Sequence, residues 1–273
     1  MNRAQRVDTG WSGTVATSLL IIIPTYNEQE LIEGNVLKLL GFFAKQPSWD
    51  ARVLIVDSSR DRTPDIAARL ASEHPAVHWR RFGAGVGKGK KVAAAATEAP
   101  AQHPADVYSF IDADLPIACD QFLSIVEHVR AGANLASATR LAPGGAAIRP
   151  LHRRLTSAAG NAFFNLFLRL PVTDFHAGAK AWDNAVAKHT WPSVTDEKFF
   201  FDAELLFLAH RQGMIMNEVP VRYVDLRAGA YSKATIVQGA FDFAANSARL
   251  LMRHGWRHKP YRLPAGERCS PST

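Results

Sequence analysis

Short apolar runs alternate with helical patterns through the first part of the chain. The run 18–24 is continuously apolar, as in a strand buried on both faces, and three further strands are predicted at 51–57, 77–82 and 107–111. Helical spacing of apolar residues, or an alanine-rich composition, predicts helices between them at 28–44, 63–72 and 92–99. Strands and helices that alternate at this spacing predict an α/β fold with a mostly parallel sheet flanked by helices.

The pattern changes from about residue 150. The segment 155–169 predicts a helix whose apolar residues cover most of its circumference, and basic residues precede it. A helix at 201–212, a strand at 215–224 and an amphipathic helix at about 235–253 are predicted to follow. No internal repeat interrupts this order, so the second part is predicted to complete the same domain.

Length and composition fit one globular domain. The chain has 273 residues, of which 47% are hydrophobic and 21% charged. We expect a single domain over 18–253, a flexible segment over 1–17 and a basic, flexible tail over 254–273.

Cysteine usage and apolar runs indicate the compartment. The two cysteines, Cys119 and Cys269, do not predict a disulfide framework, so a reducing compartment fits. No signal peptide is expected at the N-terminus. The longest aliphatic run, 19–23, is only about a quarter of a membrane span. We therefore expect a cytoplasmic protein.

The chain carries a surplus of positive charge. Its formal net charge is +7 and its pI is near 9.6, which favours anionic partners such as phosphates, nucleic acid or an acidic membrane face. A surplus of arginine that serves solubility explains the charge equally well. Basic residues are not interleaved with aromatic residues as in a single-strand binding platform, so nucleic acid is not an expected partner.

Polar residues follow three of the predicted strands. Ligands of parallel sheets bind beyond the carboxyl ends of the strands, so Pro24-Thr25-Tyr26, Asp57 and the pair Asp112/Asp114 are expected to converge on one edge. Two carboxylates one residue apart can share Mg²⁺ or Mn²⁺, which would bridge to a diphosphate and neutralise a leaving nucleotide. An exposed acidic turn is the alternative, and the position after an apolar strand favours the metal site.

A glycine- and lysine-rich segment, 83–91, resembles a phosphate loop only superficially. Phe82 stands where a P-loop needs Gly, and Gly89 stands where it needs Ser or Thr. Lys88 and Lys90 occupy glycine positions of the dinucleotide fingerprint. A flexible basic loop that approaches a nucleotide or its phosphates remains a hypothesis, and a solvated charged turn is its alternative.

Taken in order, these segments resemble inverting family 2 glycosyltransferases, which have the GT-A fold. The segments are Pro24-Thr25-Tyr26-Asn27-Glu28, the stretch 57–63, Gly87-Lys88-Gly89 and Asp112-Ala113-Asp114-Leu115. Later segments resemble the polyprenyl-phosphate hexose synthases, including dolichyl-phosphate mannose synthase: 138–140, 153–157, 174–180, 201–205, 218–221 and 227–233. The resemblance covers roughly residues 18–240, and its strength lies in the ordered series.

The resemblance implies roles for individual residues. Those implied to bind the nucleotide-sugar are Pro24, Tyr26, Glu28, Asp57, Asp112, Ala113, Arg227 and Lys233, and the basic segment adds Lys88. The implied ligands of Mg²⁺ or Mn²⁺ are Asp112 and Asp114, and the implied contacts of an acceptor phosphate are Arg140, Arg153 and Ser157. The residues expected to carry catalysis are Asp114, Arg153 and Asp202. Pro116 stands where the mannose synthases often have Gln, a further metal ligand.

The implied reaction moves a hexose from a nucleotide-diphosphate sugar to a polyprenyl phosphate with inversion. The second pKa of a phosphate monoester is about 6, so the acceptor is already a nucleophile at neutral pH. It needs arginines that position it more than a base that deprotonates it. The first alternative is a soluble family 2 glycosyltransferase that acts on a hydroxyl, with Asp202 as base. The other alternative is a binding module without catalysis.

A lipid acceptor implies a membrane surface. We expect peripheral binding at the inner face of the membrane through an amphipathic helix at about 150–169, helped by 235–253. The basic residues expected at the head groups are Arg149, Arg153 and Arg154, and the aromatic residues expected in the interface are Phe163, Phe164 and Phe167. The alternative is that these phenylalanines are buried in the core. The sequence also leaves open whether a membrane protein is a partner.

Overall fold

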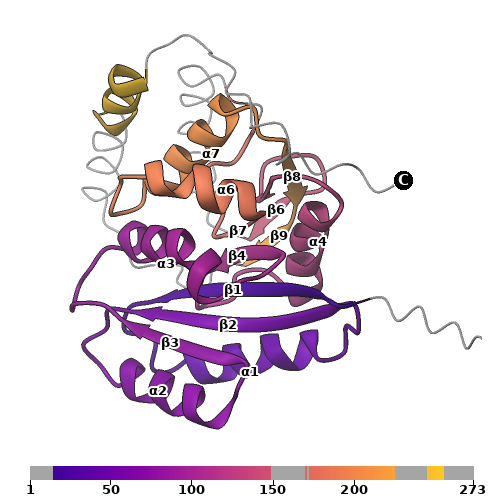
Figure 1. The fold of residues 1–273 in the computed structure, drawn as a ribbon, viewed down its shortest axis with the longest axis vertical. Coiled ribbons are helices and arrows are strands. Elements are labelled where there is room, and N and C mark those ends of the chain that lie inside the picture. The colour runs from indigo at the N-terminus through magenta and orange to yellow at the C-terminus, as the bar shows by residue number, and fades with distance from the viewer. Residues whose placement is uncertain (1–14, 149–169, 171, 225–244, 255–273) are drawn as a thin grey trace, which may run out of the picture.

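The computed structural model describes residues 15–148, 170, 172–224 and 245–254. Within them, seven strands form one sheet in the order β3-β2-β1-β4-β7-β5-β8 (Figure 1). The strands are β1 (Thr17–Thr25), β2 (Trp49–Asp57), β3 (Val77–Arg81), β4 (Val107–Ile111), β5 (Leu135–Thr139), β7 (Ala179–Trp182) and β8 (Met216–Pro220). All neighbours are parallel except β7, which is antiparallel to β4 and to β5. β6 (Ala146–Ile148) and β9 (Arg222–Val224) form a separate parallel pair.

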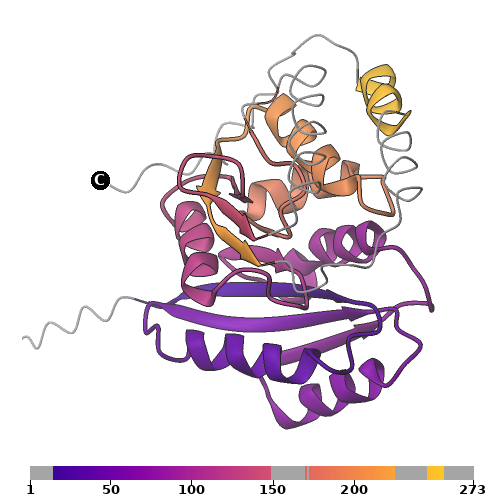
Figure 2. The same ribbon diagram turned by 180° about the vertical axis from the view of Figure 1, so that it is seen from behind.

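Helices cover both faces of the sheet (Figures 1 and 2). One face packs against α1 (Ile32–Phe43), α2 (Thr63–Glu73) and α4 (Cys119–Arg130). The other packs against α3 (Lys88–Gln102), α6 (Asn184–His189), the 3₁₀ helix η1 (Trp191–Ser193) and α7 (Phe201–Arg211). Successive side chains of β1 enter opposite cores, Ile21 and Ile23 one and Leu20 and Ile22 the other. This is why the strand is continuously apolar.

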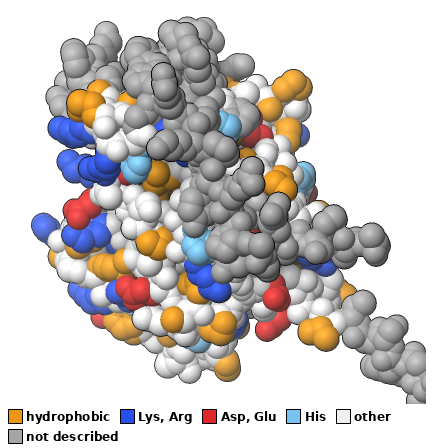
Figure 3. All heavy atoms as spheres, turned by 45° about the horizontal axis from the view of Figure 1, so that its top comes forward, with side chains coloured by type: hydrophobic (Ala, Val, Ile, Leu, Met, Phe, Trp, Pro, Cys, Tyr) orange, Lys and Arg blue, Asp and Glu red, His pale blue; other side chains and the backbone are white. Residues whose placement is uncertain are grey.

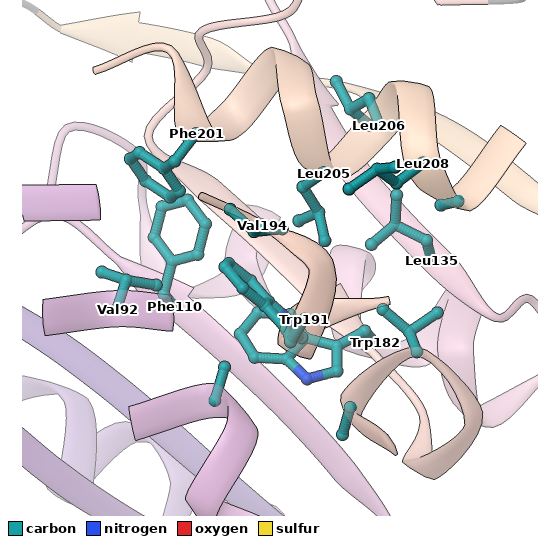
Figure 4. Packing of buried hydrophobic residues seen from close by; sticks show 14 of the residues in the cluster. Val92, Phe110, Leu135, Trp182, Trp191, Val194, Phe201, Leu205, Leu206 and Leu208 are labelled. Atoms are coloured by element: carbon teal, nitrogen blue, oxygen red, sulfur yellow. The ribbon is translucent and has the colours of Figure 1, made fainter. Parts of the chain in front are cut away.

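Aromatic side chains fill the core between the sheet and α7 (Figure 4). The ring centroids of Trp182 and Trp191 are 5.0 Å apart, and those of Phe110 and Phe201 are 5.7 Å apart. All four side chains are fully buried. Aromatic pairs at this spacing add to the free energy gained by burial alone, so they hold α7 firmly on β4 and β7.

The structure confirms the predicted fold class and most predicted elements of the first part. The strand predicted at 107–111 is β4 itself, and the other three predicted strands differ from β1, β2 and β3 by no more than two residues at either end. The first predicted helix begins later than expected, at Ile32. The pattern did not predict α4, β5, β7 or α6.

The strand predicted at 215–224 is wrong as a single element. β8 pairs with β5 in the large sheet, whereas β9 pairs with β6 in the small one. The chain passes from one sheet to the other at Val221, whose N–H donates to Thr139 O of β5 and whose carbonyl accepts from Ala146 N of β6, both at 2.9 Å. The helix predicted at 155–169 lies outside the described residues, and of the one predicted at 235–253 the structure describes 245–254, which are helical. The proposed domain limits remain predictions.

The described residues contain no helix long and apolar enough to cross a membrane.

The glycine- and lysine-rich segment is a loop only over 83–87, and its remainder is helical. α3 begins at Lys88, four residues before the predicted start, with Gly87 as its N-cap. The backbone N–H of Gly89 donates to Lys198 O at 2.9 Å, and that of Lys90 donates to Glu197 O at 3.2 Å. These amides are therefore engaged by the chain itself rather than free for phosphates.

Close backbone approach explains Gly87 and Gly89. A methyl group on Gly89 would lie 2.9 Å from Lys198 O and 3.0 Å from Glu197 C, and one on Gly87 would collide with Glu197 O. Any side chain at either position would push the segment 196–198 away from the first turn of α3.

We predict that Gly89→Ala destabilises the protein by about 1–3 kcal/mol, because the backbone it would meet cannot rotate away as a side chain does. The control is Gly34→Ala in α1, where an added methyl meets nothing within 4 Å. That change should stabilise by about 0.5–1 kcal/mol, the usual gain of Ala over Gly within a helix. Urea unfolding of both variants measures the difference. Equal stabilities would show that the segment 196–198 is not held against α3.

Candidate active site

The carboxyl ends of β1, β2 and β4 meet at one edge of the sheet. Thr25 and Asp57 are register partners at the ends of β1 and β2, and β4 lies on the other side of β1. Asp112 follows β4 directly. The predicted convergence of strand-end residues on one edge is therefore what the structure shows.

Asp57 is fully buried at this edge. Its Oδ1 accepts hydrogen bonds from Thr25 Oγ1 at 2.8 Å, from Ser59 N at 3.2 Å and from Ser59 Oγ at 2.5 Å. Its Oδ2 is buried and accepts no hydrogen bond from any described residue. A buried carboxylate oxygen without a donor is unfavourable, so this atom is suited to accept an N–H from a ligand.

The turn after β1 is fixed from the end of β2. The N–H of Asn27 donates to Ser59 Oγ and that of Glu28 donates to Thr63 Oγ1, both at 2.8 Å. Asn27 adopts a left-handed conformation, with φ of 56°. Glu28 is buried, whereas Tyr26 is 48% exposed and presents its ring to solvent beside this turn. Pro24 lies buried within β1.

The acidic pair lies in a tight turn. The N–H of Leu115 donates to Asp112 O at 3.0 Å, and Leu115 has φ of 43°. Asn35 Nδ2 donates to Ala113 O at 2.7 Å, which fixes the middle of the motif to α1. A methyl group on Gly178, just before β7, would collide with Asp112 Oδ2, so a side chain there would displace the carboxylate.

Lys88 forms an ion pair with Asp112. The distance from Lys88 Nζ to Asp112 Oδ1 is 2.6 Å. Burial alone would lower the pKa of Lys88, but attraction by Asp112 and Asp202 outweighs it and holds this pKa above its usual value. Lys88 therefore stays charged at the centre of the site, and its ammonium also faces the rings of Phe110 and Phe201.

The two acids fit a hard divalent cation that also binds a substrate. Mg²⁺ is commonly held by one or two carboxylates together with phosphate oxygens and water. Among the described residues no group of three or more His, Cys, Asp or Glu side chains could hold a metal ion. Asp112 already attracts a cation, the ammonium of Lys88. The chemistry of the donor set therefore suits a metal completed by a diphosphate.

Asp202, the predicted alternative base, is held in a buried ion pair. Lys180 Nζ lies 2.9 Å from Asp202 Oδ1 and also donates to Phe175 O at 3.2 Å and to Ala177 O at 3.0 Å. Both charged groups are almost completely buried. A carboxylate fixed by an ammonium is poorly suited to remove a proton, because protonating it would leave the ammonium without its counter-charge.

Arg140, predicted to bind the acceptor phosphate, lies in a second buried pair. Its Nε and Nη2 each lie 2.6 Å from an oxygen of Asp174, and its backbone N–H donates to the same carboxylate at 3.0 Å. Burial alone would raise the pKa of Asp174, but hydrogen bonds from Arg140 hold it below its usual value. A phosphate contact by Arg140 would use the remaining Nη1 and stays a prediction.

The other predicted contacts lie outside the described residues: Arg153, Ser157, Arg227 and Lys233. Sequence reasoning missed Lys180 and Lys91, both fully buried on the same side of the sheet as α3 and α7. Lys91 had a detectable signal, since it falls at helical spacing with the apolar positions Ala95 and Ala99 of α3. Lys180 ends the segment 174–180 that carried part of the resemblance, but its partner Asp202 is remote in sequence, so no role was assigned to it.

Sequence comparison gives a consistent family. Residues 20–189 match the model of glycosyl transferase family 2. The chain is 31% identical over 204 residues to glycosyltransferase AglD of Haloferax volcanii, covering 74% of this chain but only 32% of that longer protein. It is 31% identical over 214 residues to the undecaprenyl-phosphate mannosyltransferase of Micrococcus luteus, covering 77% of this chain and 85% of that protein.

Structure comparison gives the same fold. Glucosyl-3-phosphoglycerate synthase of Mycobacterium tuberculosis, solved with Mn²⁺, UDP and phosphoglyceric acid, matches with a TM-score of 0.62 and 15% identity. The match covers 88% of this chain and 79% of that one. The family match extends over more than half of the chain and includes the strand-end acids described above. The chain belongs to glycosyltransferase family 2 and has the GT-A fold.

Proposed function

We propose that this enzyme transfers a hexose from a nucleoside diphosphate sugar to a polyprenyl phosphate. The observation that carries the proposal is the Lys180–Asp202 ion pair, because it leaves Asp202 poorly suited as a base. The same site has the groups needed to hold a nucleotide-sugar donor. A phosphate acceptor is ionised at neutral pH and needs no base. The similarity to a mannosyltransferase that uses undecaprenyl phosphate supports the same acceptor class.

The donor's base would bind at the ends of β1 and β2. Asp57 Oδ2 would accept one ring N–H of the base, and the exposed ring of Tyr26 would offer a stacking face. Uracil and guanine carry a ring N–H beside a carbonyl, whereas cytosine and adenine present a lone pair there that a carboxylate repels. We therefore infer a uridine or guanosine diphosphate sugar as donor.

The donor's diphosphate would lie over the acidic pair. Asp112 and Asp114 would hold Mg²⁺ or Mn²⁺, and the ion would supply Lewis-acid stabilisation of the leaving diphosphate. Lys88, kept charged by Asp112 and Asp202, supplies a second cation at the same place. Arg227 and Lys233 lie outside the described residues, and we propose that they close over the donor.

The acceptor would be positioned rather than deprotonated. Its phosphate oxygen attacks the anomeric carbon, the bond from that carbon to the diphosphate breaks, and the nucleoside diphosphate leaves with the electron pair. A single displacement of this kind inverts the anomeric centre. We propose Arg153, Ser157 and Arg140 as the phosphate contacts. If the acceptor were instead a hydroxyl, Asp202 would have to leave Lys180 before it could act as a base.

The described part of the chain has features of a lipid-facing surface. Phe199 is 71% exposed and Met252 is 78% exposed, and Arg249 lies close to Met252 on the helical residues 245–254. Figure 3 shows lysine and arginine side chains gathered along one side of the face that it views. We propose that this surface and the segment 150–169 bind the cytoplasmic leaflet.

Membrane binding predicts flotation with anionic vesicles. The parent protein should float with phosphatidylglycerol vesicles and remain at the bottom with neutral phosphatidylcholine, because basic residues would supply the attraction. Arg249→Glu should reduce recovery, while the control Lys45→Glu, an exposed change after α1, should not. No recovery with either vesicle would contradict peripheral binding.

Metal dependence is expected for turnover. We predict that removing divalent ions with EDTA, or Asp114→Asn, lowers kcat by roughly 100-fold or more, since a Lewis acid contributes several kcal/mol to such a transition state. Mn²⁺ or Mg²⁺ should restore the stripped parent protein but not the variant. The control is Asp120→Asn, an exposed acid on α4. Full activity without metal would rule out this role for the acidic pair.

Arg153 provides the test of the acceptor. Arg153→Ala should lower kcat/KM for a polyprenyl phosphate by roughly 30- to 1000-fold, on the order of 2–4 kcal/mol, because a bidentate contact to the phosphate is lost. Lys at this position should rescue only partly, since it lacks the planar fork. Donor affinity should hardly change, as calorimetry with UDP and GDP would measure.

The neighbouring Arg154→Ala is the matched control, because it removes the same charge and should have a much smaller effect on kcat/KM. If Arg153→Ala loses donor binding, or transfers sugar as well as the parent protein, the acceptor has been placed wrongly. Transfer to a glycan or small-molecule hydroxyl, with no transfer to polyprenyl phosphate, would favour the alternative with Asp202 as base.

A further inference from the structure

Lys91 is a buried lysine with no assigned role. It lies in the first turns of α3 and is only 2% exposed, in the stripe that also contains Val92 and Ala95. Its Nζ donates to Thr25 O at 2.5 Å and to Ser58 Oγ at 2.7 Å. The ammonium therefore joins α3 to the ends of β1 and β2, where Asp57 lies.

The two acceptors of Lys91 do not themselves require a lysine. Thr25 O also accepts from Ser58 N at 3.3 Å, and Ser58 Oγ donates to Val86 O at 3.0 Å. Replacing Lys91 by an apolar side chain would thus leave each acceptor group with another hydrogen bond. What such a replacement would remove is the positive charge.

Burial of that positive charge is unfavourable. Burial lowers the pKa of Lys91 to about 8, and repulsion by Lys88 adds to this effect, whereas Asp57 and Glu28 raise the pKa. No described carboxylate lies within ion-pair distance of Lys91. A buried ammonium without a contacting counter-ion destabilises a fold, and such groups persist where function uses them.

We propose that Lys91 is a positioning residue for donor binding: its ammonium, which donates to Thr25 O and Ser58 Oγ, holds the ends of β1 and β2 in the geometry that accepts the nucleoside. This proposal rests on the donor site of the proposed function. Because Asp57 Oδ1 is engaged by Thr25 and Ser59, and Lys91 holds Thr25 through its carbonyl, the position of Oδ2 depends on these strand ends.

The test compares Lys91→Met with Lys90→Met. Lys90 is the adjacent, exposed lysine, paired with Glu197, so its variant removes the same charge from the same helix. Calorimetric titration of both variants and of the parent protein uses UDP and GDP with Mg²⁺ at pH 7. Lys91→Met should weaken binding by roughly 10-fold, the size of effect expected when a charged hydrogen-bond donor no longer holds the two strand ends in place. Lys90→Met should bind as the parent does.

Thermal unfolding separates this role from a structural one. The pKa of Lys91 is lower in the folded than in the unfolded chain, so its charge opposes folding fully below pH 8 and less as pH rises toward 10.5. Removing the charge should therefore leave the melting temperature of Lys91→Met at pH 7 unchanged or raised. A positioning residue thus loses binding without losing stability.

The pH profile gives an independent readout. The charged groups around Lys91 are Asp57 on β2, Glu28 after β1 and Lys88 on α3. Lys91 is charged below about 8 and neutral above it, so nucleotide affinity of the parent protein should fall relative to Lys91→Met between pH 7 and 8.5, before the ring N–H of uracil or guanine is itself lost. At the upper pH the two affinities should approach each other.

Each other outcome overturns the proposal. Equal affinity of Lys91→Met and the parent protein at pH 7 would exclude the role in donor binding. A lower melting temperature together with weaker binding would assign Lys91 to the stability of the fold. If the parent protein itself binds neither UDP nor GDP, the donor site fails and the role of Lys91 fails with it.

Discussion

Lys88 and Asp112 form an ion pair between the first turn of α3 and the end of β4, with 2.6 Å between Nζ and Oδ1. The same kind of pairing recurs around the site, between Lys180 and Asp202 and between Arg140 and Asp174. A charge removed from water is strongly unfavourable unless an opposite charge meets it. Helices and strands must therefore meet in an arrangement that satisfies all three pairs at once, which fixes the edge of the sheet where the acids lie.

Close backbone approach brings the members of these pairs together. Gly87 and Gly89 let the segment 196–198 lie directly on the first turn of α3. That segment leads into α7: Asp196 Oδ1 accepts from the N–H groups of Phe200 and Phe201, so it fixes the start of the helix. Lys88 and Asp202 consequently lie close enough for their charges to attract, although they are 114 positions apart in the sequence and no local pattern could specify this. The glycines are thus part of the electrostatic arrangement.

Local pattern was sufficient for the positions of the strand-end acids. β1, β2 and β4 are buried on both faces, so their apolar runs and the polar residues after them were visible in the sequence. Local pattern was insufficient where a remote contact decides the structure. The first turn of α3 was interpreted as a flexible loop because nothing local shows that its glycines face 196–198. The separation of β8 from β9 depends likewise on which strands lie beside them.

The charge pairs also bear on which acceptor the site can use. A transferase that acts on hydroxyl groups needs a base to remove the hydroxyl proton. Asp202 is instead the counter-charge of Lys180. Lys180 in turn holds the carbonyls of Phe175 and Ala177, directly before the glycine that abuts Asp112. Under the proposed function, an acceptor that arrives already ionised removes the requirement for a base. The carboxylate of Asp202 is then free to serve as a buried counter-charge that keeps β7 close to the acidic pair.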